Sequence, residues 1–314
     1  MTISHLFSLL GGLGLFLYGM QSLREQLEEA AGHRMKQILE KMTETTFRGF
    51  FAGTAVTATV QSSSAVMVIL VSLVDSGILT LRQVCPVILG ANVGTTITGQ
   101  IIALDLDMAA PLMAFFGVLI LIFTKKKSWQ CIGSLFSGLG VMFIGLSMME
   151  YAMAPLGESE RFLALLENCR HPLKGIFAGL IFTALIQSSS ASVGILQTLA
   201  RQGIVDIRQS IPIVFGQNLG TCITAFFASV GGGINARRTA LVHLLINLLG
   251  TVLFLILGAI LPLADWMVYS SPDSPAHQIA NVHTLFNMVT SLVLLPFSRM
   301  LAELAKRMVP DRRR

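Results

Sequence analysis

A short polar segment interrupts a long apolar run of this chain, and the interruption occurs twice. Residues 61–65 read Gln-Ser-Ser-Ser-Ala, and residues 187–191 repeat the same five residues 126 positions later. An unpaired polar group in the hydrocarbon core of a bilayer costs several kcal/mol, because lipid offers it no hydrogen-bond partner. Four consecutive polar residues therefore predict a re-entrant hairpin of two short helices, folded at the polar segment and buried inside the protein.

The composition indicates that lipid is the solvent of this chain. Hydrophobic residues make up 53% of the 314 residues and charged residues only 12%, against about 25% charged residues in soluble domains. Apolar stretches of roughly 17–25 residues, the length that crosses a bilayer, recur along the chain. The net charge of +5 comes from Lys and Arg between these stretches. Because no basic face on a soluble surface is available, a nucleic-acid partner is excluded.

The two polar segments belong to an internal duplication. Residues 47–98 and 173–224 share 25 identical positions out of 52 without a gap, and the same offset aligns the glycines of residues 12–19 with those of 138–145. The identities are mostly Gly, Gln, Ser, Asn and Thr rather than Leu and Val. General similarity between apolar segments therefore does not explain them, and each unit carries its own copy of the hairpin.

We predict an all-α integral membrane protein built from two inverted repeats. Re-entrant hairpins are expected at 47–74 and 173–199, followed by broken spans at 81–104 and 208–230 that unwind at Gly-x-Asn-x-Gly. Residues 24–44 read as an amphipathic helix on the membrane surface. Repeat 1 covers 1–124, repeat 2 covers 125–263, and 264–314 form a final span and a basic tail. The seven expected spans are 5–23, 81–104, 108–124, 131–149, 208–230, 236–263 and 279–297.

The number of spans between the hairpins determines their orientation. Three spans separate them, and because three is odd, the hairpins enter the membrane from opposite faces. This topology places 17 Lys and Arg residues on one face and 5 on the other. The positive-inside rule makes the richer face cytoplasmic. We therefore expect the N-terminus outside and the C-terminus in the cytoplasm, in a plasma membrane or bacterial inner membrane.

Inverted repeats with discontinuous helices are typical of secondary transporters. At each hairpin tip one helix ends in free carbonyl groups and another begins with free N–H groups, which suit a cation and an anion respectively. The tips contain no charged residue. A helix start supplies about 0.3–2 kcal/mol, less than the several kcal/mol that desolvating an ion costs. A bound anion would therefore need a co-bound cation, and neutral oxygens of Gln, Asn and Thr favour Na⁺ over a proton.

The doubled Gln-Ser-Ser-Ser-Ala, each copy followed about 30 residues later by Gly-x-Asn-x-Gly-Thr, resembles the sodium–phosphate cotransporter family, that is, the type II group of animals and its bacterial relatives. Supporting blocks are residues 12–20, 236–238 and 283–287. The resemblance implies Na⁺-driven movement of inorganic phosphate by alternating access, with no cofactor beyond Na⁺ as the coupling ion. It favours an elevator motion and leaves a homodimer open. Many bacterial members continue into a PhoU-like helical domain, which we expect to be missing here.

The same resemblance implies which residues bind each ion. Phosphate is expected at Gln61, Ser62, Ser63, Ser64, Gln187, Ser188, Ser189 and Ser190. Sodium is expected at Gln61, Asn92, Thr95, Thr96, Gln187, Asn218 and Thr221.

Two histidines lie inside predicted spans, each four residues before an asparagine: His243 before Asn247, and His283 before Asn287. Ionisable residues within spans are functional hypotheses by default, so a gate or a pH sensor is one interpretation. We favour a structural one, in which each histidine ties two helices together through a hydrogen bond.

Other functions remain open at this stage. The same fold serves a phosphate exporter or a carrier of another small anion, and a non-transporting phosphate sensor is a remote alternative. Polar contacts between packed helices are another interpretation of the tips, but two copies in register with Gly-x-Asn-x-Gly-Thr disfavour it. An intramembrane serine hydrolase is disfavoured too, because nothing marks one serine as a nucleophile and a duplicated nucleophile is not expected. We therefore predict that the protein is not an enzyme.

Overall fold

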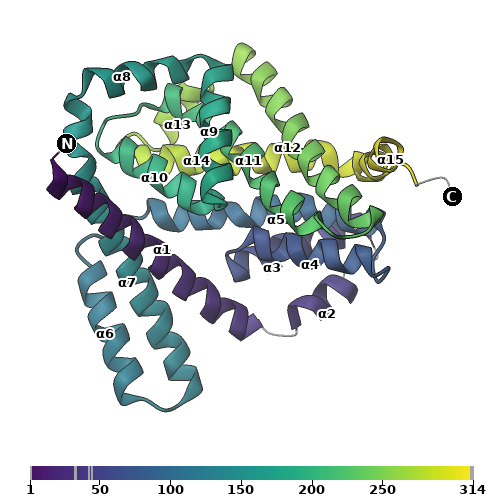
Figure 1. The fold of residues 1–314 in the computed structure, drawn as a ribbon, viewed down its shortest axis with the longest axis horizontal. Coiled ribbons are helices and arrows are strands. Elements are labelled where there is room, and N and C mark those ends of the chain that lie inside the picture. Colours follow the sequence, from purple (N-terminus) through teal and green to yellow (C-terminus); the bar gives the residue numbers. More distant parts are fainter. Residues whose placement is uncertain (1, 32–33, 42, 44, 312–314) are drawn as a thin grey trace.

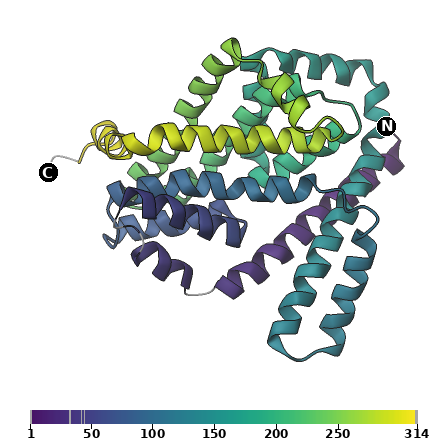
Figure 2. The ribbon, with the colours of Figure 1, turned by 180° about the vertical axis from the view of Figure 1, so that it is seen from behind.

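The protein is a bundle of helices with one long helical arm (Figures 1 and 2). The computed structural model describes residues 2–31, 34–41, 43 and 45–311. In chain order its helices are α1 (Ile3–Ala31), α2 (Arg34–Lys41), α3 (Thr46–Val60), α4 (Ser63–Asp75), α5 (Leu81–Ala103), α6 (Ala110–Phe123), α7 (Lys127–Met153), η1 (Ala154–Glu158), α8 (Glu160–Glu167), η2 (Asn168–Arg170), α9 (Pro172–Ile186), α10 (Ser189–Arg201), α11 (Ile207–Ser229), α12 (Ile234–Ile260), α13 (Leu263–Ser270), α14 (Pro275–Leu294), η3 (Leu295–Phe297) and α15 (Ser298–Met308).

Six helices within the described ranges are long and apolar enough to cross a membrane, which agrees with an all-α integral membrane protein. They are Ile3–Glu29, Leu81–Ala103, Lys127–Glu158, Ile207–Ser229, Ile234–Ile260 and Pro275–Met308. They correspond to six of the predicted spans. The remaining prediction, 108–124, coincides with α6, whose 14 residues fall short of the roughly 17–25 that a span needs. In both views α6 and α7 project together from one end of the bundle (Figures 1 and 2).

Both predicted hairpins are present, and their tips have the same backbone geometry. Helix α3 ends at Gln61 with φ 58°, and α9 ends at Gln187 with φ 56°; these are the two non-glycine residues with positive φ among those described. A left-handed residue at this position ends a helix and turns the chain. The next helix then begins at once, with Ser62 and Ser188 as its N-caps.

Helices α1 and α7 show that the two repeats are inverted. A Cβ on Gly12 would overlap the carbonyl oxygen of Gly145, and a Cβ on Gly19 would overlap that of Gly138. Residues 12 and 138, and likewise 19 and 145, are equivalent under the repeat offset. The two equivalent helices therefore cross antiparallel, exchanging equivalent contacts about an internal two-fold axis.

The prediction of two broken spans was wrong. Helices α5 and α11 run without interruption over 23 residues each, through both Gly-x-Asn-x-Gly segments. Their glycines serve close packing instead: a Cβ on Gly90 would overlap the carbonyl oxygen of Phe50, and a Cβ on Gly216 would overlap that of Ile176. The first arm of each hairpin thus packs backbone to backbone on the helix that follows it.

Residues 24–44 do not form the single surface helix that the sequence predicted. Helix α1 continues through Ala31 and α2 begins at Arg34, while residues 32–33, 42 and 44 lie outside the described ranges. The chain also does not pass directly from the final span into a basic tail, because residues 298–308 form a further helix. Helix α15 packs on α5 and α12 and buries Leu301, Ala302 and Ala305.

The glycine contacts predict a stability difference between two identical substitutions. Gly90→Ala forces α3 away from α5, and overpacking of this kind costs about 1–3 kcal/mol. Gly14→Ala, on the exposed side of α1 with open space around it, serves as the control and is expected to be neutral or slightly stabilising. Thermal unfolding of both variants in detergent checks the prediction, which is wrong if the two unfold at the same temperature.

Candidate functional site

The tip of the first hairpin is held against α5 by its own side chains. Thr98 Oγ1 donates to Gln61 Oε1 at 2.7 Å, and the Gln61 amide donates to the carbonyl of Ala58 in α3. Thr95 Oγ1 donates to Ser63 Oγ at 3.2 Å. Gln61 is therefore buried and fully engaged, which stabilises its left-handed backbone.

The remaining serines of this tip serve the start of α4. Ser62 Oγ accepts from the N–H of Ala65 at 3.2 Å, the usual role of an N-cap. Ser64 is half-buried and its hydroxyl makes no hydrogen bond with the described residues.

The tip of the second hairpin has the same backbone but much freer side chains. Gln187 is exposed, and its side-chain amide forms no hydrogen bond within the described ranges. Ser188 caps α10 by accepting from the N–H of Ala191 at 3.3 Å. Ser189 and Ser190 are 7% and 5% exposed, and their hydroxyls have no protein partner among described residues. The two half-sites are therefore not equivalent: α5 binds Gln61 and Ser63 at the first tip, whereas the side chains of Gln187, Ser189 and Ser190 at the second tip keep their donors available.

An arginine that the sequence analysis placed on the membrane surface joins the two tips. Arg24, half-buried in α1, donates from Nε to the carbonyl oxygen of Gln61 at 3.0 Å, and its Nη2 lies 3.5 Å from Ser188 Oγ. The hairpin tips thus meet within reach of one guanidinium group. Within the described part of the chain, no carboxylate lies within ion-pair distance of Arg24; its further contact is Met20 Sδ at 3.6 Å.

Arg24 corrects the expectation that only neutral groups surround a bound anion. The tip segments carry no charge, but a full positive charge from α1 lies at their junction, beside the N-terminal ends of α4 and α10. Two opposite unit charges 4 Å apart attract by about 4 kcal/mol at an effective dielectric constant of 20. A co-bound cation is therefore not the only available source of compensation for a buried anion.

The predicted sodium ligands divide into two groups. Gln61 and Thr95 lie at the first tip, where Gln61 is bonded by Thr98 and Thr95 bonds Ser63. Gln187 lies at the second tip. The other four predicted ligands occupy α5 and α11: Asn92, Thr96, Asn218 and Thr221. Of these, Thr96 Oγ1 and Thr221 Oγ1 donate to carbonyls of their own helices at 2.7 Å and 2.9 Å. Their oxygen lone pairs remain available to a cation.

The two repeat-related asparagines bind later helices in the same manner. Asn92 Nδ2 donates to Asn247 Oδ1 of α12 at 3.4 Å, and Asn218 Oδ1 accepts from Asn287 Nδ2 of α14 at 3.0 Å. All four are buried. Buried amide pairs of this kind align helices, because an unpaired amide in the interior is costly.

No hydrogen bond is seen at the Nδ1 atoms of the two histidines. His243 and His283 are 1% and 2% exposed, yet the Nδ1 atom of each has no hydrogen-bond partner in the described structure. The cross-helix bonds on these helix faces come from the asparagine one turn later, Asn247 or Asn287. A gating or structural role for the histidines stays a prediction.

Comparison with known proteins places this architecture in a family. A model of the Na⁺/Pi-cotransporter family matches residues 15–151 and 156–268. The uncharacterized protein YqeW of Bacillus subtilis is 34% identical over 296 residues, covering 94% of this chain and 95% of YqeW. No solved structure gives a significant match.

Two further relatives carry functional names. YjbB of Salmonella typhimurium, whose name proposes inorganic phosphate export, is 29% identical over 313 residues, covering 99% of this chain. This chain spans just over half, 56%, of the length of YjbB. Human sodium-dependent phosphate transport protein 2B is 38% identical over 104 residues, covering 32% of this chain and 15% of that protein. The chain therefore belongs to the Na⁺/Pi-cotransporter family, a family of membrane transporters.

Proposed function

We propose that this protein is a Na⁺-coupled transporter of inorganic phosphate, with its site at the junction of the two hairpin tips. The observation that carries the proposal is the meeting of both tips at one arginine, beside two buried serines whose hydroxyls have no protein partner among the described residues. Family membership and the phosphate transport named for two of its relatives support the choice of anion.

In this proposal each group at the junction has a distinct task. The N–H groups at the starts of α4 and α10 face the phosphate oxygens, which helix N-termini favour. Hydroxyls of Ser189 and Ser190 donate to the same oxygens. Gln187, exposed and unbonded, is free to reach the ligand. Sodium binds the carbonyl end of a hairpin arm together with Asn and Thr oxygens of α5 or α11, since hard cations prefer oxygen ligands.

Export is the second candidate function, and the name of YjbB favours it. The site serves either direction, because ion and substrate gradients set the direction of net flux. We place the protein in a plasma or bacterial inner membrane. The N-terminus outside is the prediction of the seven-span topology and its 17-to-5 distribution of Lys and Arg, which counts α6 as a span.

Removing the two buried serine hydroxyls should slow phosphate transport. Each hydrogen bond to a charged group contributes about 1.5–3 kcal/mol, so Ser189→Ala/Ser190→Ala is expected to reduce flux by about 10-fold or more. Ser72→Ala, on the exposed side of α4, is the matched control. Radiolabelled phosphate uptake into proteoliposomes measures both. Equal flux in the double variant and the control would show that these serines of the second tip do not bind the transported phosphate.

Sodium coupling is tested separately with unmutated protein. Uptake and efflux of phosphate are each measured under an inward or outward Na⁺ gradient, with K⁺ as the replacement ion. We expect flux in either direction to follow the Na⁺ gradient, because the cation at the tips neutralises the anion's remaining charge. Phosphate flux at the same rate in K⁺ would overturn the coupling and leave the tip site standing.

A further inference from the structure

We propose that Arg24 is the residue that binds the transported anion directly and sets the selectivity of the site for anions. This inference rests on the proposed function. Its basis is positional: Arg24 is the charged side chain that contacts both hairpin tips, bonding the carbonyl of Gln61 and lying beside Ser188 Oγ. Within the described ranges, the rest of the tip contacts are made by neutral groups.

The hydrogen bonds of Arg24 leave part of its guanidinium available. Its Nε–H is used by Gln61, and Nη2 has only two long contacts, to Ser188 Oγ at 3.5 Å and to Met20 Sδ at 3.6 Å. Nη1 makes no hydrogen bond with the described residues. A planar guanidinium with free N–H groups matches two oxygens of an oxyanion. Such an anion would also reach the starts of α4 and α10.

The bond to Gln61 explains how the arginine is held there without a carboxylate. The carbonyl of Gln61 lies at the C-terminal end of α3, where the helix dipole is negative and free carbonyl groups attract cations. The guanidinium is therefore a fixed cation at the carbonyl end of a hairpin helix, which is where the sequence predicts a bound Na⁺. The corresponding carbonyl of Gln187 forms no such bond to an arginine of the described residues, so the second tip would retain that position for a mobile cation.

Phosphate binding to the purified protein, measured by titration calorimetry, tests the assignment. Arg24→Gln is expected to bind phosphate about 10- to 100-fold more weakly, the equivalent of one charge-assisted hydrogen bond. Arg24→Lys keeps the charge without the planar fork and should fall between Arg24→Gln and the unmutated protein. Arg82→Gln, which removes an exposed ion pair of 2.9 Å to Glu303, is the control and should bind normally.

The outcomes separate the two levels of the proposal. If the unmutated protein neither binds nor carries phosphate, the proposed function fails. If it binds phosphate and Arg24→Gln binds equally well, only the role of Arg24 fails. In case Arg24→Gln does not fold, the unmutated protein is treated with phenylglyoxal and mapped by mass spectrometry. Phosphate should then protect Arg24 but not Arg82, and an unchanged modification rate at Arg24 would overturn the inference.

A separate observation concerns the residue equivalent to Arg24 in the second repeat, which carries the opposite charge. The offset of 126 relates Arg24 to Glu150, and it relates Asp75, at the end of α4, to Arg201, at the end of α10. Each repeat therefore contains one potential ion pair of reversed polarity. The first residue of each pair lies on α1 or α7, and the second lies at the base of a hairpin.

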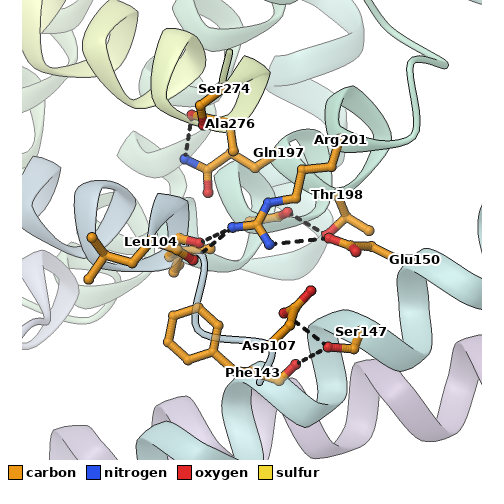
Figure 3. Close-up of polar contacts among 12 residues, drawn as sticks. Leu104, Asp107, Phe143, Ser147, Glu150, Gln197, Thr198, Arg201, Ser274 and Ala276 are labelled. Carbon is orange, nitrogen blue, oxygen red and sulfur yellow. Dashed lines mark hydrogen bonds and ion pairs between the residues drawn. The ribbon is translucent and has the colours of Figure 1, made fainter. Parts of the chain in front are cut away.

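In this structure only the pair of the second repeat is closed. Arg201 Nη1 lies 3.3 Å from Glu150 Oε1, and both side chains are 16% exposed. Arg201 Nη2 also donates to the carbonyl oxygens of Ile102 and Leu104 at the end of α5, at 2.9 and 3.0 Å (Figure 3). In the first repeat, Arg24 lies at the tips instead, and Asp75 accepts from the N–H groups of Gly233 and Ala236.

In transporters with inverted repeats, one repeat moves against the other around a fixed site, and an exchange of conformations between the two repeats would give the opposite-facing state. We infer that the protein alternates between the closed Glu150–Arg201 pair seen here and a closed Arg24–Asp75 pair. In the second state Arg24 would leave the tips to pair with Asp75. The site would then lose its guanidinium, which weakens the binding of the anion and favours its release.

Cross-linking by Hg²⁺ in a variant with its four cysteines replaced tests this exchange. Glu150→Cys/Arg201→Cys and Arg24→Cys/Asp75→Cys should both cross-link, although only the first pair is adjacent here. Arg24→Cys/Arg201→Cys should not. Cross-linking of the first pair alone would overturn the exchange.

Discussion

Backbone-to-backbone packing at glycine is the constraint on which the site depends. In both repeats the first arm of the hairpin lies so close to the following long helix that a Cβ would overlap a carbonyl oxygen, as at Gly53 against Val87 and at Gly179 against Ile213. Close approach of this kind provides the dispersion contacts that hold membrane helices together where the hydrophobic effect does not act. It fixes each hairpin to its partner helix as one unit. The tip can then contain a left-handed glutamine without the arm shifting.

The two tips show how identical segments acquire different properties. Gln61 and Gln187 share a backbone conformation that non-glycine residues rarely adopt. Thr98 stabilises the first glutamine, whereas the second is exposed and unbonded. Equal sequence in unequal surroundings is what we would expect if the two repeats alternate as proposed, with the structure holding one of two related arrangements.

The sequence predicted the repeated hairpins and their inversion, but it did not predict how neighbouring helices contact one another. Polar residues at mid-depth predicted both hairpins, and the antiparallel crossing of α1 and α7 agrees with the predicted inversion. The count of three intervening spans that led to this prediction included α6, which is shorter than a span. The glycines flanking Asn92 predicted a break that does not occur, because glycine favours both unwinding and close packing, and only the neighbouring helix decides between them. At the two histidine–asparagine pairs, the spacing predicted a shared helix face but did not tell which side chain of each pair bonds to the neighbouring helix.

Arg24 was missed because its position along the chain suggested water. It follows an apolar run and precedes several charged residues, so that a surface location was the natural interpretation. Helix α1 instead continues beyond it and carries the guanidinium to the tips. The signal that could have found it is the repeat itself, since residues 24 and 150 are aligned and have opposite charges. Identical residues at equivalent positions reveal a duplication. Residues of opposite charge at equivalent positions, such as 24 and 150, reveal where the two repeats differ.

A fixed arginine at the tips changes how much of the phosphate charge a co-bound sodium ion would have to compensate. Around neutral pH inorganic phosphate carries one or two negative charges, and a single guanidinium compensates only one of them. A singly charged phosphate beside Arg24 leaves the site neutral, but a doubly charged one leaves a buried negative charge, whose desolvation costs several kcal/mol. A mobile cation at the free carbonyl end of the second tip offsets that remaining charge. Sodium coupling would then follow from the second charge of the anion rather than from the absence of cationic side chains.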